Sequence, residues 1–376
     1  MSEPTQPMPG PSEPPSIPAA QTGPPAPKTS TWKYTLGLVV LALAAGGGWY
    51  AYTMQANPVP PPPDELQALK FYIQHISKTQ SLAPQYTDAN GDLVADAPTD
   101  PAKFLKVDEI VFSVVGTDNP QDAEKVWKDF MAALAAATGD KVKVRYASGI
   151  GSVQDQVKAV AEGRLHVTAF NTGQVSTAVN TAGFVPLFCP ADKAGKYAYQ
   201  MEILVRADSP IQKPEDLKGK TVGFVAMSSN SGGKAPIVLL KDTFGMYPGR
   251  DYRYTVSGDH IRGMKDMLAG RFDAACVAND LLAREVAKGE LQPSNFRSIY
   301  KSDSFPPLCF GVPHNLPPEL LAQVKQTFTK FSFDGNSVGE FYKGRGPVKF
   351  APVNYKDDWK LTREVDDSLT RLLDTK

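Results

Sequence analysis

The sequence predicts two α/β units behind a single membrane-spanning helix, and three observations lead to this prediction. From Glu109 onward, short apolar runs typical of strands alternate with amphipathic runs typical of helices. The same alternation begins again at Thr221. Strands that alternate with helices favour a largely parallel sheet with helices on both faces. Residues 35–54 carry no charged side chain and are long enough to cross a bilayer.

The two α/β units are similar in size. The first is predicted to contain strand Ile110–Val115, helix Asp122–Thr138, strand Val142–Tyr146, helix Val153–Gly163 and strand Leu165–Phe170. The second is predicted to contain strand Val222–Ala226, helix Ala235–Phe244, strand Tyr252–Val256, helix Ile261–Ala269, strand Phe272–Val277 and helix Leu281–Lys288.

Composition fits a globular protein and excludes some function classes. The chain has 376 residues, 42% of them hydrophobic, so about two compact domains are expected after the N-terminal segment. The 40 Lys and Arg residues balance the 40 Asp and Glu residues. Without a basic surplus we expect no nucleic-acid partner. Any site for an anion must therefore be built locally.

The N-terminal residues are expected to tether the protein to a membrane. Residues 1–33 are rich in Pro, Ser and Thr and are predicted to form a disordered tail. Residues 34–54 form the predicted transmembrane anchor, and the prolines of residues 55–63 form a stiff spacer.

The charges beside the anchor predict its orientation. Lys28 and Lys33 precede it, so the tail stays in the cytoplasm and the C-terminal domain lies on the periplasmic side of the inner or cytoplasmic membrane. A cleaved signal peptide is the alternative, because the small residues Ala42, Ala44 and Ala45 suit a signal peptidase.

Residues 64–106 are predicted to add a helix over 64–79 and an acidic loop. Oxygen-bearing side chains recur in this loop at Asp88, Asn90, Asp92 and Asp96. Such spacing favours a hard cation such as calcium, and a solvated linker is the alternative. No other cofactor is expected.

Polar residues concentrate in three turns that join a predicted strand to a helix. In open α/β sheets, ligands bind beyond the carboxyl ends of the strands. The first turn offers Ser229, Asn230 and Ser231, then the flexible backbone of Gly232 and Gly233. N–H groups at a helix N-terminus favour an anion, although simple capping of the helix is the alternative.

The other two turns carry one candidate residue each. His260 can donate to an oxyanion, and Asp280 can accept a hydrogen bond from a protonated one. The alternatives are a structural histidine and a carboxylate that only caps a helix.

These turns and their surroundings resemble the phosphate-, phosphite- and phosphonate-binding proteins of ABC transporters, the PhnD type. The resemblance covers residues 107–332 and is carried by five segments in order: Ser209–Phe224, Ser228–Gly233, Gly245–Pro248, Ser257–His260 and Gly270–Ala275. It implies a two-lobed type 2 periplasmic-binding-protein fold with a hinge, in which the lobes close on the ligand. Lobe 1 would comprise residues 107–205 and 301–376, and lobe 2 residues 206–300.

The resemblance also implies roles for individual residues. Ser229, Asn230 and Ser231 match the family's Ser/Thr-rich loop, His260 its histidine and Asp280 its acidic residue. Tyr199, or alternatively Tyr197, matches an aromatic residue of the family's site.

One departure from the family bears on the ligand. The segment around Leu308 lacks the carboxylate that binders of aminoalkylphosphonates carry, which favours phosphate, phosphite or a small phosphonate.

The implied partners are this small oxyanion and separate permease and ATPase subunits. A ligand-sensing module coupled to a signalling partner is the alternative function. An enzyme is not expected, because no G-x-S-x-G turn or metal-ligand spacing is present.

The chain has three cysteines that are far apart in the sequence, Cys189, Cys276 and Cys309. Cys276 fits a buried strand. A disulfide between Cys189 and Cys309 can form in an oxidising compartment.

Overall fold

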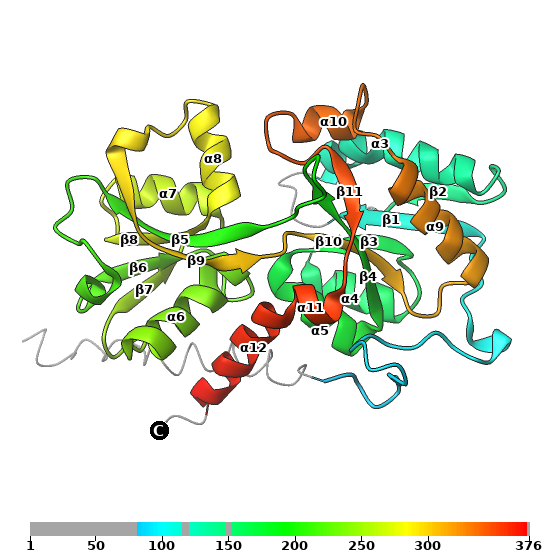
Figure 1. The fold of residues 1–376 in the computed structure, drawn as a ribbon, viewed down its shortest axis with the longest axis horizontal. Coiled ribbons are helices and arrows are strands. Elements are labelled where there is room, and N and C mark those ends of the chain that lie inside the picture. Colours follow the sequence, from blue (N-terminus) through cyan, green and yellow to red (C-terminus); the bar gives the residue numbers. More distant parts are fainter. Residues whose placement is uncertain (1–80, 115–119, 148–149, 151, 374–376) are drawn as a thin grey trace, which may run out of the picture. The chain divides into compact units, whose positions relative to one another are not determined.

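The computed structural model describes residues 81–114, 120–147, 150 and 152–373 (Figure 1). The predicted tail, anchor, spacer and helix over 64–79 lie outside the described residues. Among the residues that are described, no helix combines the length and apolar character needed to span a bilayer.

The first lobe is built on a six-stranded mixed sheet in the order β11-β4-β10-β3-β1-β2. β1 runs parallel to β2 and β3, whereas β10 is antiparallel to β3 and β4, and β11 is antiparallel to β4. The strands are β1 (Glu109–Val114), β2 (Lys143–Tyr146), β3 (Val167–Phe170), β4 (Phe184–Ala191), β10 (Cys309–Pro313) and β11 (Lys349–Pro352).

Helices cover both faces of this sheet because successive side chains of a strand point to opposite faces. In β1, Ile110 and Phe112 enter one apolar cluster and Val111 enters the other. The first cluster includes residues of α3 (Pro120–Ala137), α9 (Pro318–Lys330) and α10 (Ser337–Tyr342). The second includes residues of α4 (Val153–Ala161), α5 (Thr172–Ala182) and α11 (Tyr355–Asp358).

The second lobe is built on a five-stranded sheet in the order β7-β6-β8-β5-β9. β6, β7 and β8 are parallel and β5 is antiparallel to both of its neighbours. The strands are β5 (Tyr199–Arg206), β6 (Thr221–Phe224), β7 (Arg253–Val256), β8 (Ala274–Ala278) and β9 (Phe296–Phe305). α6 (Ala235–Phe244) packs on one face, and α7 (His260–Leu268) and α8 (Asn279–Ala287) pack on the other.

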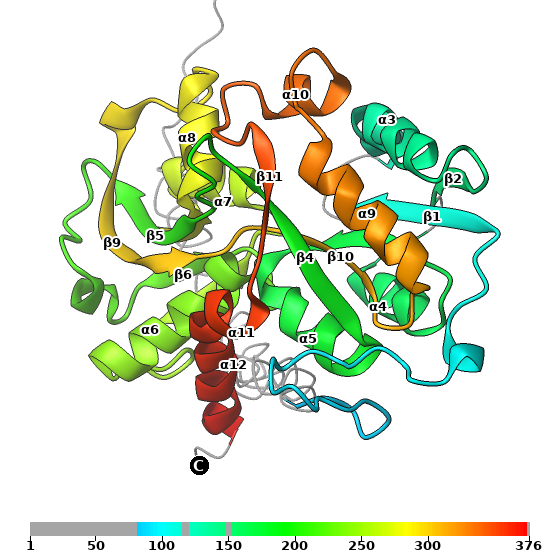
Figure 2. The same cartoon turned by 45° about the vertical axis from the view of Figure 1, so that its right-hand side comes forward.

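The C-terminal helix α12 (Lys360–Leu373) packs beside α6 of the second lobe (Figures 1 and 2). Val365, Leu369 and Leu372 are buried in the same apolar cluster as α6. The sequence had assigned residues 301–376 to lobe 1. The helix joins the second lobe instead because its apolar residues pack into the cluster that contains α6.

The lobe boundaries differ from the prediction in two further places. The second sheet begins with β5 at Tyr199 rather than after residue 205, and it ends with β9 at Phe305 rather than at residue 300. The chain therefore passes between the sheets three times: from β4 to β5, from β9 to β10, and from α11 to α12.

Candidate functional site

The turn after β6 leads into a short π-helix, Asn230–Lys234, which continues as α6. The Ser229 Oγ accepts a hydrogen bond of 3.1 Å from the Gly232 N–H. A Cβ on Gly232 would lie 2.4 Å from the Cβ of Val225. Glycine is thus needed here for the turn to fold against β6. The Gly232 N–H, predicted to meet a ligand, is already bonded within the turn.

A buried polar cluster lies at the start of this π-helix. The Asn230 Nδ2 donates to the Tyr199 hydroxyl over 3.1 Å. Ser231 and Thr172, the first residue of α5, also hydrogen-bond to that hydroxyl. Burial raises the pKa of Tyr199, these bonds lower it, and the negative charge of Asp280 raises it further. The cluster therefore joins a helix of the first lobe to the turn of the second, with Asp280 within electrostatic reach.

Asn230 has hydrogen-bonding capacity to spare. Its Oδ1 is buried and has no partner among the described residues. The amide oxygen and nitrogen exchange places when the group is turned over. In that orientation the Tyr199 hydroxyl donates to Oδ1 and the NH₂ group is the one left over. Asn230 can thus present either an acceptor or a donor to a ligand, and Tyr199 stays bonded in both cases.

His260 begins α7, in the turn that follows β7. Asp259 caps the helix, since its Oδ1 accepts a 2.8 Å hydrogen bond from the Arg262 N–H. Burial lowers the pKa of His260 to about 4, with Arg284 adding to the decrease and Asp259 opposing it. The His260 Nδ1 is buried and has no partner among the described residues. At neutral pH the side chain is therefore a neutral imidazole with an unused ring nitrogen.

The depressed pKa of His260 predicts a loss of stability in acid. An imidazole titrates near pH 6.5 in the unfolded chain and near 4 here, so between these values the unfolded chain binds more protons. The free energy of unfolding should fall as pH decreases through this window. Between pH 7.5 and 5, we expect His260→Gln to lose on the order of 1–2 kcal/mol less than the native chain. Urea denaturation of both proteins at both pH values measures this difference, and equal losses would contradict it.

Asp280 is the second residue of α8. Its side chain is exposed, yet the protein around it removes enough hydration to raise the pKa of the carboxyl group. Backbone N–H groups of Asp280 and Leu281, together with Arg284, partly oppose that increase. The charge of Asp280 also reaches the first lobe, where it contributes to the raised pKa of the buried Tyr342.

The structure adds a tyrosine hydroxyl that the sequence did not single out. The Tyr342 hydroxyl is buried without a partner among the described residues. Nearby, the Arg345 guanidinium lies 4.0 Å from the centre of the Phe341 ring. Burial and the neighbouring Arg284 lower the pKa of Arg345. The end of α10 and the loop after it thus bring a hydroxyl and a cation within electrostatic reach of α8.

A fully buried lysine links the π-helix to α12 and α5. Lys234 is 1% exposed, and its Nζ lies 2.8 Å from the Asp366 Oδ1 in α12. The same Nζ donates to the carbonyl oxygen of Gly173 in α5. Burial raises the pKa of Asp366 and the charge of Lys234 opposes the increase. Nothing in the sequence pattern singled out this lysine.

The backbones of the two lobes approach closely at the same place. A Cβ on Gly173 would lie 2.6 Å from the Ser228 carbonyl oxygen and 2.8 Å from the Asn230 nitrogen. The first turn of α5 therefore contacts the polar turn directly. The signal in the sequence was Asn171-Thr172-Gly173, which follows a predicted strand in the same way as the other three turns.

The two candidate tyrosines have different surroundings. The Tyr197 hydroxyl donates to the Asp358 Oδ2 over 2.7 Å, in the first lobe. Tyr199 instead lies in the cluster with Asn230. Tyr199 is therefore the tyrosine that accompanies the polar turn.

In the acidic loop, side-chain oxygens accept hydrogen bonds from N–H groups of the same loop. The two Asp88 carboxylate oxygens accept from the Asp92 and Leu93 N–H groups, and Asp96 accepts from the Ala89 N–H. Asn90 donates to Asp92. Within the described ranges, no group of three or more His, Cys, Asp or Glu side chains is placed to hold a metal ion. The calcium site remains a prediction without structural support.

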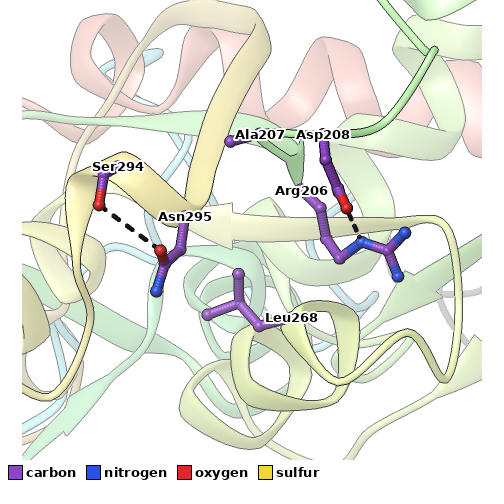
Figure 3. A pocket seen from close by; sticks show the side chains of 6 residues that line it. All are labelled: Arg206, Ala207, Asp208, Leu268, Ser294 and Asn295. Atoms are coloured by element: carbon purple, nitrogen blue, oxygen red, sulfur yellow. Dashed lines mark hydrogen bonds and ion pairs between the residues drawn. The ribbon is translucent and has the colours of Figure 1, made fainter.

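A separate pocket opens at the outer end of the second lobe (Figure 3). Its volume is about 360 Å³ and its lining includes Arg206, Asp208 and Asn295. The Arg206 Nε lies 3.0 Å from the Asp208 Oδ1, so its cation is already paired. This pocket contains none of the predicted site residues.

Comparisons with known proteins agree with this architecture. A family model described as "ABC transporter, phosphonate, periplasmic substrate-binding protein" matches residues 112–359. The phosphate-import protein PhnD of Mycolicibacterium smegmatis is 26% identical over 237 residues, which cover 60% of this chain and 72% of that protein.

Two solved structures share the fold. PhnD1 from Prochlorococcus marinus, solved with methylphosphonate, has a TM-score of 0.57 at 14% identity, covering 72% of this chain and 100% of that one. A binding protein component of an ABC phosphonate transporter from Pseudomonas aeruginosa has a TM-score of 0.54 at 17% identity, covering 71% and 97%. Because the family model spans most of the chain and nearly all of both sheets, the chain belongs to the periplasmic substrate-binding proteins of phosphonate ABC transporters.

Proposed function

We propose that this protein captures phosphate, phosphite or a small phosphonate and delivers it to ABC permease and ATPase subunits. Residues 34–54 hold it at the membrane, with the binding lobes on the periplasmic side. The observation that carries the proposal is the buried Tyr199–Asn230–Ser231 cluster, in which Asn230 retains an unused polar atom. His260 and Asp280 open the two neighbouring helices of the same lobe.

Neutral donors are sufficient for useful affinity. A hydrogen bond to a charged group contributes about 1.5–3 kcal/mol, and a micromolar Kd requires about 8 kcal/mol. Three to five such bonds give about 5–15 kcal/mol, and four or five at the upper end of that range reach this value after an ordering cost of about 4 kcal/mol is deducted. Asn230, Ser231, Tyr199 and His260 can supply them, whereas the buried charge of Lys234 is already paired with Asp366.

The choice among phosphorus oxyanions rests on what is missing near Leu308. No carboxylate stands there to pair with an ammonium group. A similar protein is named for phosphate import and another was solved with methylphosphonate. Both ligands lack an ammonium group, which supports the same choice here.

Calorimetry of the full-length protein in detergent tests the function. The ligands are phosphate, phosphite, methylphosphonate, aminoethylphosphonate and sulfate. We expect at least one of the first three to bind with micromolar or lower Kd, and the last two to bind more weakly. Tightest binding of aminoethylphosphonate, or equal binding of all five, would contradict the proposal.

Asp280 is expected to discriminate against sulfate. A phosphorus oxyanion that keeps a proton can donate it to this carboxylate, whereas fully ionised sulfate meets an unpaired like charge. Asp280→Ala should narrow the ratio of phosphate to sulfate affinity by roughly tenfold. Asp208→Ala, which removes a carboxylate at the outer pocket of the same lobe, is the control and should leave the ratio unchanged. An equal loss of both affinities in Asp280→Ala would refute this role.

The tether is open to a direct test. Mass spectrometry of the membrane fraction should find the intact N-terminus. A mature protein that begins after Ala45 would indicate a cleaved signal peptide instead. Cellular uptake of the ligand that is unchanged when this protein is deleted would favour the ligand-sensing alternative.

A further inference from the structure

Two of the three cysteines lie opposite each other in the first lobe. Cys189 is in β4 and Cys309 begins β10. In this antiparallel pair of strands, Phe188 is opposite Phe310. One step further in the same register sets Cys189 opposite Cys309. Both side chains are completely buried in one apolar cluster, and their thiols are hydrogen-bond partners.

This placement suits a covalent bond. Residues opposite each other in an antiparallel pair have Cα atoms about 4.5–5.5 Å apart, within the roughly 4.4–6.8 Å that disulfides span. Family membership places the domain in the periplasm, where disulfides form and persist. We propose that Cys189 and Cys309 form a disulfide in the exported protein and that Cys276 remains a thiol. The proposal depends on the compartment and not on which ligand is bound.

The chemistry is a thiol–disulfide exchange. One cysteine thiolate attacks the disulfide of a periplasmic thiol oxidase, and the second cysteine displaces that mixed disulfide. The Sγ–Sγ bond forms, each cysteine loses its hydrogen, and the oxidase takes up two electrons and two protons to become a dithiol. Because both thiols are buried in the finished fold, the exchange must take place while the first lobe is still folding.

The bond would close a long segment of the chain. Residues 190–308 contain every strand of the second sheet, and they leave from β4 and return through β10. Both bonded residues belong to the first sheet, so the bond does not cross between the lobes. It should therefore stabilise the native protein by constraining the unfolded chain, without restraining movement of one lobe against the other.

The test counts thiols in the full-length protein after export. The cells are quenched in acid, and the protein is denatured and alkylated without reductant before mass spectrometry. We expect one alkylated thiol, at Cys276, and a peptide in which Cys189 and Cys309 are cross-linked. Cys276→Ser should then show no alkylated thiol, and Cys189→Ser should show two. Three alkylated thiols in the exported native chain would overturn the proposal.

Thermal unfolding provides a second readout. Native chain that is unfolded, reduced and refolded in reductant should have an unfolding midpoint lower by on the order of 5–10 °C than the oxidised native chain. The same treatment should leave the midpoint of the Cys189→Ser/Cys309→Ser double variant unchanged. A midpoint insensitive to reductant in both proteins would also count against the bond. Affinity for phosphate should be unaffected throughout, so failure of the disulfide and failure of the proposed function are separate results.

Discussion

Replacing Lys234 by methionine should lower the free energy of unfolding by about 3–5 kcal/mol, because it leaves a buried carboxylate without its cation. Lys234 and Asp366 are 1% and 8% exposed at their side chains, and their charged atoms are 2.8 Å apart. The substitution also removes the bond to the Gly173 carbonyl oxygen. Urea denaturation followed by fluorescence measures the change.

Two further variants separate burial of the charge from loss of the lysine itself. Lys234→Met/Asp366→Leu removes both charges and should recover most of the lost stability, since well-packed apolar pairs replace buried ion pairs without large cost. Lys265→Met is the matched control. Lys265 pairs with Glu290 at 2.9 Å, but the two side chains are 50% and 53% exposed, so the loss should stay below about 1 kcal/mol. Equal losses in Lys234→Met and Lys265→Met would show that burial of the pair does not matter.

Asn230→Asp should weaken the binding of phosphate by at least roughly 100-fold. The substitution keeps the size and shape of the side chain and can keep its bond to Tyr199. It removes a donor to the anion, worth about 1.5–3 kcal/mol, and adds a negative charge where the anion must lie. Calorimetry with phosphate at pH 7.5 measures the loss.

The matched control for this substitution is Asn295→Asp. Asn295 lines the outer pocket of the same lobe (Figure 3), so the variant carries the same added charge away from the polar turn. Its affinity for phosphate should change less than about threefold. If a folded Asn230→Asp variant also stays within that range, the polar turn is not the anion site.

The sequence predicted the parallel parts of the fold well because their signals are local. Helix Ala235–Phe244 was predicted and observed with the same bounds. Each such helix follows a strand and a polar turn and carries an apolar stripe of its own. All three signals lie within about 25 residues of one another. The turns with Asn230, His260 and Asp280 were found for the same reason.

The antiparallel strands were not predicted, because nothing close to them in the sequence indicates their pairing. β4 contains Pro186 and Pro190, residues that usually argue against an internal strand. It is nevertheless an inner strand, between β10 and β11. β10 and β11 come from more than 100 residues further along the chain. Only the finished sheet brings these segments together.

Lys234 and Thr172 were missed for a related reason. A lysine after a glycine pair looks like a solvated helix residue, and its partner Asp366 is 132 positions away. Thr172 bonds to the Pro306 carbonyl oxygen, 134 positions away. Interactions over such separations depend on tertiary structure, which periodicity and turn chemistry do not encode.

The third passage of the chain between the sheets would constrain any movement of one lobe against the other. Any rotation of one lobe must bend the backbone near Trp359 as well as the two strand connections. The Trp359 indole nitrogen donates to the Thr172 carbonyl oxygen over 3.3 Å, which anchors this C-terminal pivot to the helix that abuts the polar turn. Torsion between the lobes would strain all three joints at once, whereas a simple swing about one axis bends each of them a little. Movement of one lobe against the other should therefore be a swing about one axis rather than a twist.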